Sequence, residues 1–183
     1  MTIIEIYKPY IYSVQYDGSD ENEYDRLLIL WNDVNYLVNF FEDNKEYLSS
    51  YIWNDILNAE DAANQVIEEA KELEELFDEL YENTKNGNEP DFNSHFHPLD
   101  GKYKLILEWI PMKSYGTKSP SFLRLYAIKL NENTYIITGG GIKLSDTIQN
   151  SPDLKDHVIK NIDKVRTYLK EQYIFDVEDI EPY

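Results

Sequence analysis

The stretch from Ser121 to Asp146, SFLRLYAIKLNENTYIITGGGIKLSD, constrains the fold of this chain more than any other. A short turn, Asn131-Glu132-Asn133, separates two runs of apolar residues. Turn-forming residues between runs rich in β-branched and aromatic side chains are typical of a β-hairpin. We therefore expect an antiparallel pair of strands here, followed by the glycine triplet Gly139–Gly141 and by Lys143.

Other segments predict further strands. Residues 3–7 and 10–16 have the composition of short strands, and Pro9 between them restricts pairing to a sheet edge. Tyr103–Ile110 is predicted to be a strand that ends at the following proline. Met112–Pro120 is then expected to be a loop, with two lysines that make it a small basic segment.

Three segments have the periodicity of amphipathic helices. In the first, Asp20 and Glu23 resemble a capping pair that precedes an apolar stripe, and a further short helix is predicted between Asn44 and Asn58. The second long segment, from about Glu60 to Asn83, has one apolar face and a crowd of acidic side chains elsewhere. The third begins at Ser151-Pro152, a cap residue followed by a proline. The three stripes are Tyr24, Leu27, Leu28, Trp31, Val34, Leu37, Val38 and Phe41; Ala63, Val66, Ala70, Leu73, Phe77 and Leu80; and Leu154, Val158, Ile162, Val165, Leu169 and Tyr173.

These elements predict an α+β fold. An N-terminal helical region is expected to pack on a small, mainly antiparallel sheet formed by Tyr103–Leu144, with a C-terminal helix. A length of 183 residues suits a single domain. Within residues 1–183, an acidic helical half (about 1–91) and a sheet-containing half (about 92–183) are joined by a polar linker at about 84–98. Residues 174–183 are expected to be a tail or an added strand.

The sequence also limits where the protein works. It has no cysteine, which excludes disulfide and thiolate chemistry. No apolar run approaches the roughly 20 residues that a membrane span requires. The start, MTIIEIYKPY, lacks the pattern of a signal peptide. A cytoplasmic protein with no membrane contact is therefore predicted.

Charge is distributed unevenly along the chain. Residues 1–91 carry 5 basic and 23 acidic side chains, whereas residues 92–183 carry 12 of each, so the first half accounts for the whole net charge of −18. Such an acidic field repels nucleic acid and attracts basic partners. A solvated acidic face that keeps the protein soluble is the simpler interpretation, and a basic protein partner is the alternative.

Two motifs that suggest chemistry lack the partners that this chemistry needs. His95 and His97 can ligate a metal, but a complete site needs more ligands, and His157 is the only other histidine. Gly139–Gly141 fits neither G-x-x-x-x-G-K-[ST] nor G-x-G-x-x-G. We expect the glycines to permit a β-bulge or a bend where the backbone approaches another group closely. No cofactor and no metal are predicted.

Arg124 is the residue most suggestive of function. Strand alternation places it on one face with Phe122, Tyr126, Ile128 and Leu130. A guanidinium among apolar neighbours requires an anion or hydrogen-bond acceptors. Two partners remain open: an internal carboxylate such as Glu108 on the preceding strand, or the phosphate of a substrate.

The order of these segments resembles that of the RelE/ParE-type toxin superfamily, most closely its phage-derived HigB group. The resemblance extends from about Phe96 to Lys170. The strand LRLYAI matches the family's R-x-x-Y/F strand, and TYIITGGGIK matches its apolar strand followed by lysine. Thr147 and Pro152 match its T…P stretch, which precedes a helix ending in basic residues.

The resemblance implies cleavage of mRNA, free or on the ribosome, by basic groups that contact phosphate and without a metal. It assigns the catalytic positions to Arg124 and Lys143, with Tyr126 or Tyr168 assisting. The partners it implies are a cognate antitoxin and RNA or the ribosome.

Two hypotheses follow for the function. The first is a toxin-like RNA endonuclease that uses Arg124 and Lys143, with Lys113 or Lys118, on a face of the sheet. The second is a non-enzymatic acidic protein that binds a basic partner or mimics nucleic acid. Acidic side chains remote from Arg124 favour the first hypothesis, and acidic side chains around it favour the second.

Overall fold

The computed structural model describes residues 1–53, 56, 58–88, 90–99, 110–116, 118 and 120–180. Its centre is a mixed sheet, in which the described strands have the order β1-β2-β6-β5-β4-β3. All neighbouring pairs are antiparallel except β2 and β6, which are parallel. The strands are β1 (Thr2–Tyr7), β2 (Ile11–Gln15), β3 (His97–Pro98), β4 (Ile110–Tyr115), β5 (Leu123–Lys129) and β6 (Tyr135–Ile142).

The sheet corrects part of the predicted fold. The α+β class is confirmed, but the sheet is larger than Tyr103–Leu144 and is mixed rather than mainly antiparallel, because the N-terminal strands join it through β2. β4 continues through Pro111 to Tyr115, where a loop was predicted. Pro111 pairs with β5, whereas the described β3 pairs with Met112 and Lys113. The missing N–H of Pro111 therefore removes no hydrogen bond to β3. The predicted strand residues 103–109 lie outside the described residues.

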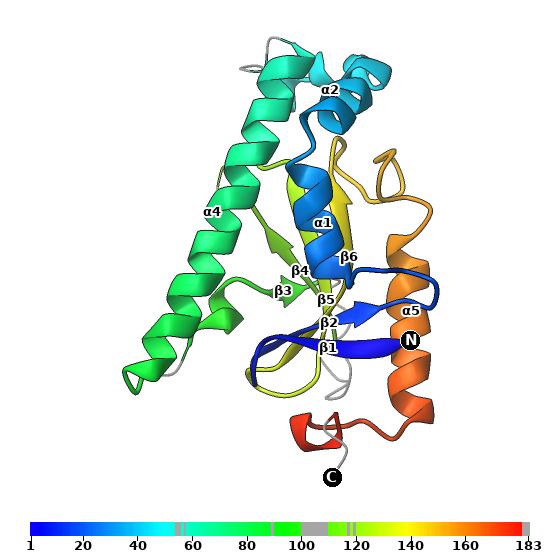
Figure 1. Cartoon of the computed structure of the whole chain (residues 1–183). Coiled ribbons are helices and arrows are strands. Elements are labelled where there is room, and N and C mark those ends of the chain that lie inside the picture. Colours follow the sequence, from blue (N-terminus) through cyan, green and yellow to red (C-terminus); the bar gives the residue numbers. More distant parts are fainter. Residues whose placement is uncertain are drawn as a thin grey trace.

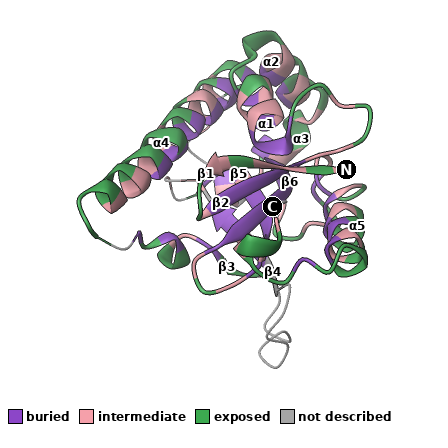
Figure 2. Cartoon of the chain, turned by 60° about the horizontal axis from the view of Figure 1, so that its bottom comes forward, coloured by how far each residue is buried: buried purple, intermediate pink, exposed green. Residues whose placement is uncertain are grey.

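Helices cover both faces of this sheet, as Figure 1 shows. α1 (Glu23–Trp31), α2 (Val34–Asp43) and the long α4 (Ala59–Lys85) pack with one face, and α5 (Val158–Glu171) crosses the other. Short helical segments are α3 (Lys45–Leu48), η1 (Tyr51–Trp53), η2 (Phe92–Ser94) and η4 (Val177–Asp179). Apolar side chains of β5 and β6 therefore divide between a core under α1, α2 and α4 and two smaller clusters under α5, and the middle of the sheet is buried throughout (Figure 2).

Several helix boundaries differ from the predicted ones. The predicted first helix is two helices, because α1 ends at Trp31 with Asn32 as its C-cap, and Asp33 then caps α2 by accepting a hydrogen bond from the Tyr36 N–H. Asn22, and not Asp20, is the N-cap of α1. α5 begins at Val158, six residues beyond Pro152. Val34 and Tyr173, predicted as core residues, are exposed.

The predicted hairpin is confirmed as β5 and β6, and its glycines have the predicted structural role. Tyr126 pairs with Gly139 and Ala127 pairs with Ile137, so Thr138 is an extra residue in a β-bulge. Gly139 has a φ of +152°, a region that side chains disfavour. The bulge turns the end of β6 away from β2, which pairs only with residues 135–137.

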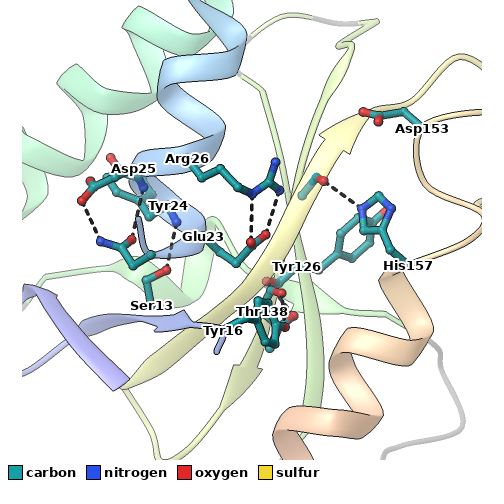
Figure 3. Close-up of polar contacts among 12 residues, drawn as sticks. Ser13, Tyr16, Glu23, Tyr24, Asp25, Arg26, Tyr126, Thr138, Asp153 and His157 are labelled. Carbon is teal, nitrogen blue, oxygen red and sulfur yellow. Dashed lines mark hydrogen bonds and ion pairs between the residues drawn. The ribbon is translucent and has the colours of Figure 1, made fainter. Parts of the chain in front are cut away.

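Beyond this point the free edge of β6 is covered by side chains rather than by a strand (Figure 3). The Tyr16 hydroxyl donates to the Thr138 carbonyl at 2.8 Å, and His157 Nε2 lies 3.2 Å from the Gly140 carbonyl. The Ile142 N–H donates to Asp153 Oδ2 at 2.7 Å. Burial raises the pKa of Asp153, while the hydrogen bond from Ile142 opposes that rise. Unpaired strand edges favour aggregation. These contacts occupy backbone hydrogen-bonding groups at the edge of β6 that a strand from another chain would otherwise pair with.

The segments predicted as linker and tail both contribute to the core. Phe92 and Phe96 are buried, and Phe96 stacks on Tyr135 with a centroid distance of 4.4 Å. Ile174 is buried after α5, and the described part of the tail ends in the η4 turn rather than in a strand. Residues 181–183 lie outside the described residues. None of the helices in the described part of the chain combines the length and apolarity needed to cross a bilayer.

Candidate functional site

Arg124 and Lys143 lie together at one end of the sheet, where two adjoining pockets meet. Pocket A has a volume of about 400 Å³ and pocket B about 340 Å³, and Arg124, Lys143 and Asp146 line both. We call the two pockets together the cleft. Lys118 adds a cation to pocket A, and Lys113 adds one to pocket B. The structure thus gathers the four basic residues that the sequence proposed for a phosphate site.

Strand alternation explains why Arg124 lies in the cleft. Leu123 and Leu125 enter the core beneath α1, α2 and α4, whereas Tyr126 packs under α5. Arg124 shares the α5 face with Tyr126, as predicted. It lies two residues before Tyr126, near the start of β5. Phe122 differs from the prediction, because it precedes the strand and packs on Trp53 in the opposite core.

Backbone carbonyls hold the Arg124 guanidinium in place. Its Nη1 donates to the Ser121 carbonyl at 3.0 Å and to the Leu123 carbonyl at 2.6 Å, and the side chain stays half-buried. Both of these acceptors are uncharged backbone carbonyls. Glu108, the predicted internal partner, lies outside the described residues.

The turn that supplies those carbonyls is fixed by Glu69 of α4, which is fully buried. One Glu69 oxygen accepts from the Ser121 hydroxyl at 2.7 Å and the Leu123 N–H at 3.1 Å, and the other accepts from the Phe122 N–H at 3.2 Å. Gln65 Nε2 donates to the carboxylate at 2.7 Å. A Cβ at Gly116 would lie 2.5 Å from Glu69 Oε2, so only glycine permits this approach. Glu69 was predicted on the acidic outer side of its helix, and that prediction is wrong.

Lys143 is a cation in an unfavourable setting. Its backbone N–H donates to the Phe122 carbonyl at 2.7 Å, and its Nζ donates to the Asp146 carbonyl at 2.7 Å. Partial burial lowers the pKa of Lys143, and the neighbouring charges of Arg124 and Lys113 lower it further, while Asp146 opposes them. A lysine with a lowered pKa gives up its proton more readily than an exposed one, which suits it to proton transfer.

A row of side chains crosses the sheet beside these two residues. Residues directly paired across strands share a face, so His97, Lys113, Tyr126 and Gly139 follow one another on β3, β4, β5 and β6. Tyr126 is 2% exposed and forms part of the wall of pocket B. His97, expected in the polar linker, lies on β3 in this row instead. Its position depends on pairing with Lys113, sixteen residues later, which no local pattern reveals.

Acidic side chains approach the cleft from one direction. Lys118 forms an ion pair with Glu68 of α4, and that pair raises the pKa of Lys118 and lowers the pKa of Glu68. Among the described lining residues, Asp146 is the acidic one, against four cations. The cleft is therefore cationic although the whole chain is strongly acidic, and α4 borders it at pocket A.

The remaining predicted site residues separate into two groups. Thr147 lines pocket B, whereas Tyr168 lines a hollow near Met1 and Asp17 at the far end of α5. Tyr168 is therefore not positioned to assist chemistry at Arg124. His95 is partly buried, and burial lowers its pKa. Within the described residues, no three histidine or acidic side chains converge as metal ligands would.

Comparison of the chain with protein-family models, with curated proteins and with solved structures gave no match.

Proposed function

We propose that the protein is a toxin-type endoribonuclease, similar in activity to the RelE/ParE-type superfamily, that cleaves single-stranded RNA without a metal. The observation that supports it best is the pair Arg124 and Lys143, shared by both pockets of a cationic cleft in an acidic chain. Fixed cations in a cleft concentrate an anionic substrate and stabilise charge that develops on phosphate. RNA cleavage of this kind belongs in the cytoplasm, with a cognate antitoxin to restrain it.

The cleavage step needs no nucleophile beyond the RNA itself. The 2′-hydroxyl oxygen attacks the adjacent phosphorus and the bond from phosphorus to the 5′ oxygen breaks, which leaves a 2′,3′-cyclic phosphate and a 5′-hydroxyl. The deprotonated fraction of Lys143 takes the proton of the 2′-hydroxyl and so becomes an ammonium, which together with Arg124 stabilises the charge on the non-bridging oxygens. The Lys113 ammonium returns a proton to the 5′ oxygen. Tyr126, buried between β5 and α5, forms part of the wall of pocket B beside these groups.

Purified protein is expected to cleave single-stranded RNA in the presence of a chelator, and its expression is expected to arrest growth. The cleavage rate should rise with pH through the lowered pKa of Lys143, because only the neutral amine accepts a proton. Lys143→Met should remove both the cleavage and the pH dependence. Lys155→Met, a change at an exposed lysine outside the described linings of the cleft, is the matched control. Intact RNA and normal growth with the wild-type protein would contradict the proposal.

A second candidate function rests on α4, which carries ten acidic and two basic side chains over its 27 residues. Two exposed ion pairs lie within the helix, Lys71 with Glu75 and Lys85 with Glu82, and ten acids against two lysines still leave it with a net charge of −8. α4 lies along one side of the molecule (Figure 1), and most of its acidic side chains are exposed. A basic protein segment, such as that of an antitoxin or a ribosomal protein, suits this surface.

For this second function we expect a complex with a basic protein that dissociates as salt is raised, because exposed charges are screened within about 10 Å at 0.1 M salt. Reversing Glu75 and Glu79 to lysine should abolish the complex, whereas reversing Glu46, an exposed acid on α3, should not. Recovery of the same partners by the α4 double variant, measured by quantitative pull-down at low salt, would count against α4 as the binding surface.

A further inference from the structure

The two pockets of the cleft are alike in plan. Each has a cation of its own, Lys118 in pocket A and Lys113 in pocket B, and each has an apolar wall. The wall of pocket A includes Ile52 and Pro120, and that of pocket B includes Ile148 and Ile159. Arg124 and Lys143 lie where the pockets meet. Both volumes fall in the range of pockets that hold a small organic group.

Two pockets on either side of a shared pair of cations match the structure of a dinucleotide unit in a nucleic acid strand. A phosphodiester is the central anion, and a nucleoside extends from it on each side. We infer that the cleft binds two consecutive nucleosides, one in each pocket, with their shared phosphate on Arg124 and Lys143. The inference rests on the proposed function and specifies its substrate as a splayed dinucleotide unit within a single strand.

A duplex does not fit this plan, because its bases are stacked and paired and cannot enter two separate pockets. Unpaired bases can be splayed apart and held against side chains, as in most sequence-specific recognition of RNA. The ion pair between Lys118 and Glu68 shows that acidic α4 borders pocket A, and this indicates the direction in which the bound strand runs. The acidic face of α4 repels further phosphates on that side, so the rest of the strand is expected to leave past pocket B.

The pockets differ in the polar groups that can read a base. Pocket B carries the Gln149 amide and the Thr147 hydroxyl. An amide offers both donors and an acceptor, the combination that base edges require. Pocket A combines its apolar wall with Ser121 and Ser145, of which the Ser121 hydroxyl is already committed to Glu69. Base preference is therefore expected to reside in pocket B, while pocket A accepts any base by apolar contact.

The test uses deoxyribose hexamers, which lack the 2′-hydroxyl and cannot be cleaved by the proposed route. All hexamers carry the same phosphates, but bases are present at no position, at one, at two adjacent positions or at two separated positions. We expect the adjacent pair to bind wild-type protein at least about 10-fold more tightly than a single base, and the separated pair to resemble the single base. Titration at fixed salt measures this.

Two variants sharpen the result. Gln149→Ala should reduce the preference among the four bases at one position of the adjacent pair, and Gln172→Ala, at an exposed glutamine beyond α5, should not. A single-stranded hexamer with all its bases should bind more tightly than its duplex.

The possible failures are distinguishable. Equal binding of all hexamers, together with RNA cleavage by the wild-type protein, would overturn the two-pocket inference and leave the proposed function intact. Equal affinity of the separated and adjacent pairs would also overturn it. Absence of both hexamer binding and RNA cleavage would overturn the proposed function and the inference together.

Discussion

Arg124→Ala is expected to reduce the RNA cleavage rate by about 100- to 1000-fold, the usual cost of removing one group that stabilises transition-state charge. The guanidinium is held by the carbonyls of Ser121 and Leu123, so it is oriented before a substrate arrives. Such preorganisation makes the loss appear mainly in kcat. Single-turnover cleavage of a labelled RNA measures the effect directly.

Two further variants separate charge from geometry and from folding. Arg124→Lys keeps the charge but loses the planar fork, so it should recover only a small part of the activity. Lys170→Ala removes the same charge from an exposed position on α5 and should leave the rate unchanged. Thermal melts of all three show whether the fold survives. A folded Arg124→Ala protein with wild-type activity would contradict the proposed role.

The placement of Arg124 and Lys143 near one end of the hairpin was predictable because each position followed from a local pattern. Alternation along the strand placed Arg124 on the face of Tyr126, and the position of Lys143 after the glycines placed it at the strand end. The cleft also needed Lys113 and Lys118, which were assigned to a loop. Pairing with β5 makes the first part of that loop a strand, and it brings Lys113 opposite Tyr126.

The sheet was less predictable because its decisive contacts are long-range. Nothing local in residues 10–16 indicates a parallel pairing with Tyr135, Ile136 and Ile137, more than a hundred residues later. The division of the first predicted helix was similarly hidden, since its apolar stripe continues through the break at Asn32 and Asp33. Periodicity reports the face that is buried but not the axis of each helix.

The burial of Glu69, by contrast, follows from the periodicity of its helix. Glu69 lies three residues after Val66 and four before Leu73, in the middle of the stripe that α4 buries. A carboxylate at such a position must find hydrogen-bond donors, because burial without them is very costly. The surrounding glutamates concealed it, since a helix with so many acidic residues is expected to expose all of them.

Glu69→Ala is therefore expected to be the most destabilising substitution outside the apolar core. It removes the two carboxylate oxygens that accept hydrogen bonds from the N–H groups of Phe122 and Leu123. Each buried donor left without a partner costs about 1–3 kcal/mol. A total loss of roughly 3–5 kcal/mol in the free energy of unfolding follows, with the cavity included. At about 2–4 °C per kcal/mol for a chain of this size, the melting temperature should fall by roughly 10 °C.

Two comparisons test this assignment to Glu69. Glu79→Ala changes an exposed acid on the same helix and should shift stability by no more than about 0.5 kcal/mol. Glu69→Gln keeps the shape but turns an NH2 group toward donors, so it should be destabilised less than the alanine variant and still measurably. Because the Ser121 and Leu123 carbonyls that orient Arg124 belong to the same turn, the glutamine variant should also lose RNA cleavage while it remains folded. Urea unfolding and single-turnover cleavage, measured on one preparation, separate the two effects. A Glu69→Gln protein with wild-type stability and activity would mean that the buried carboxylate does not hold the cleft.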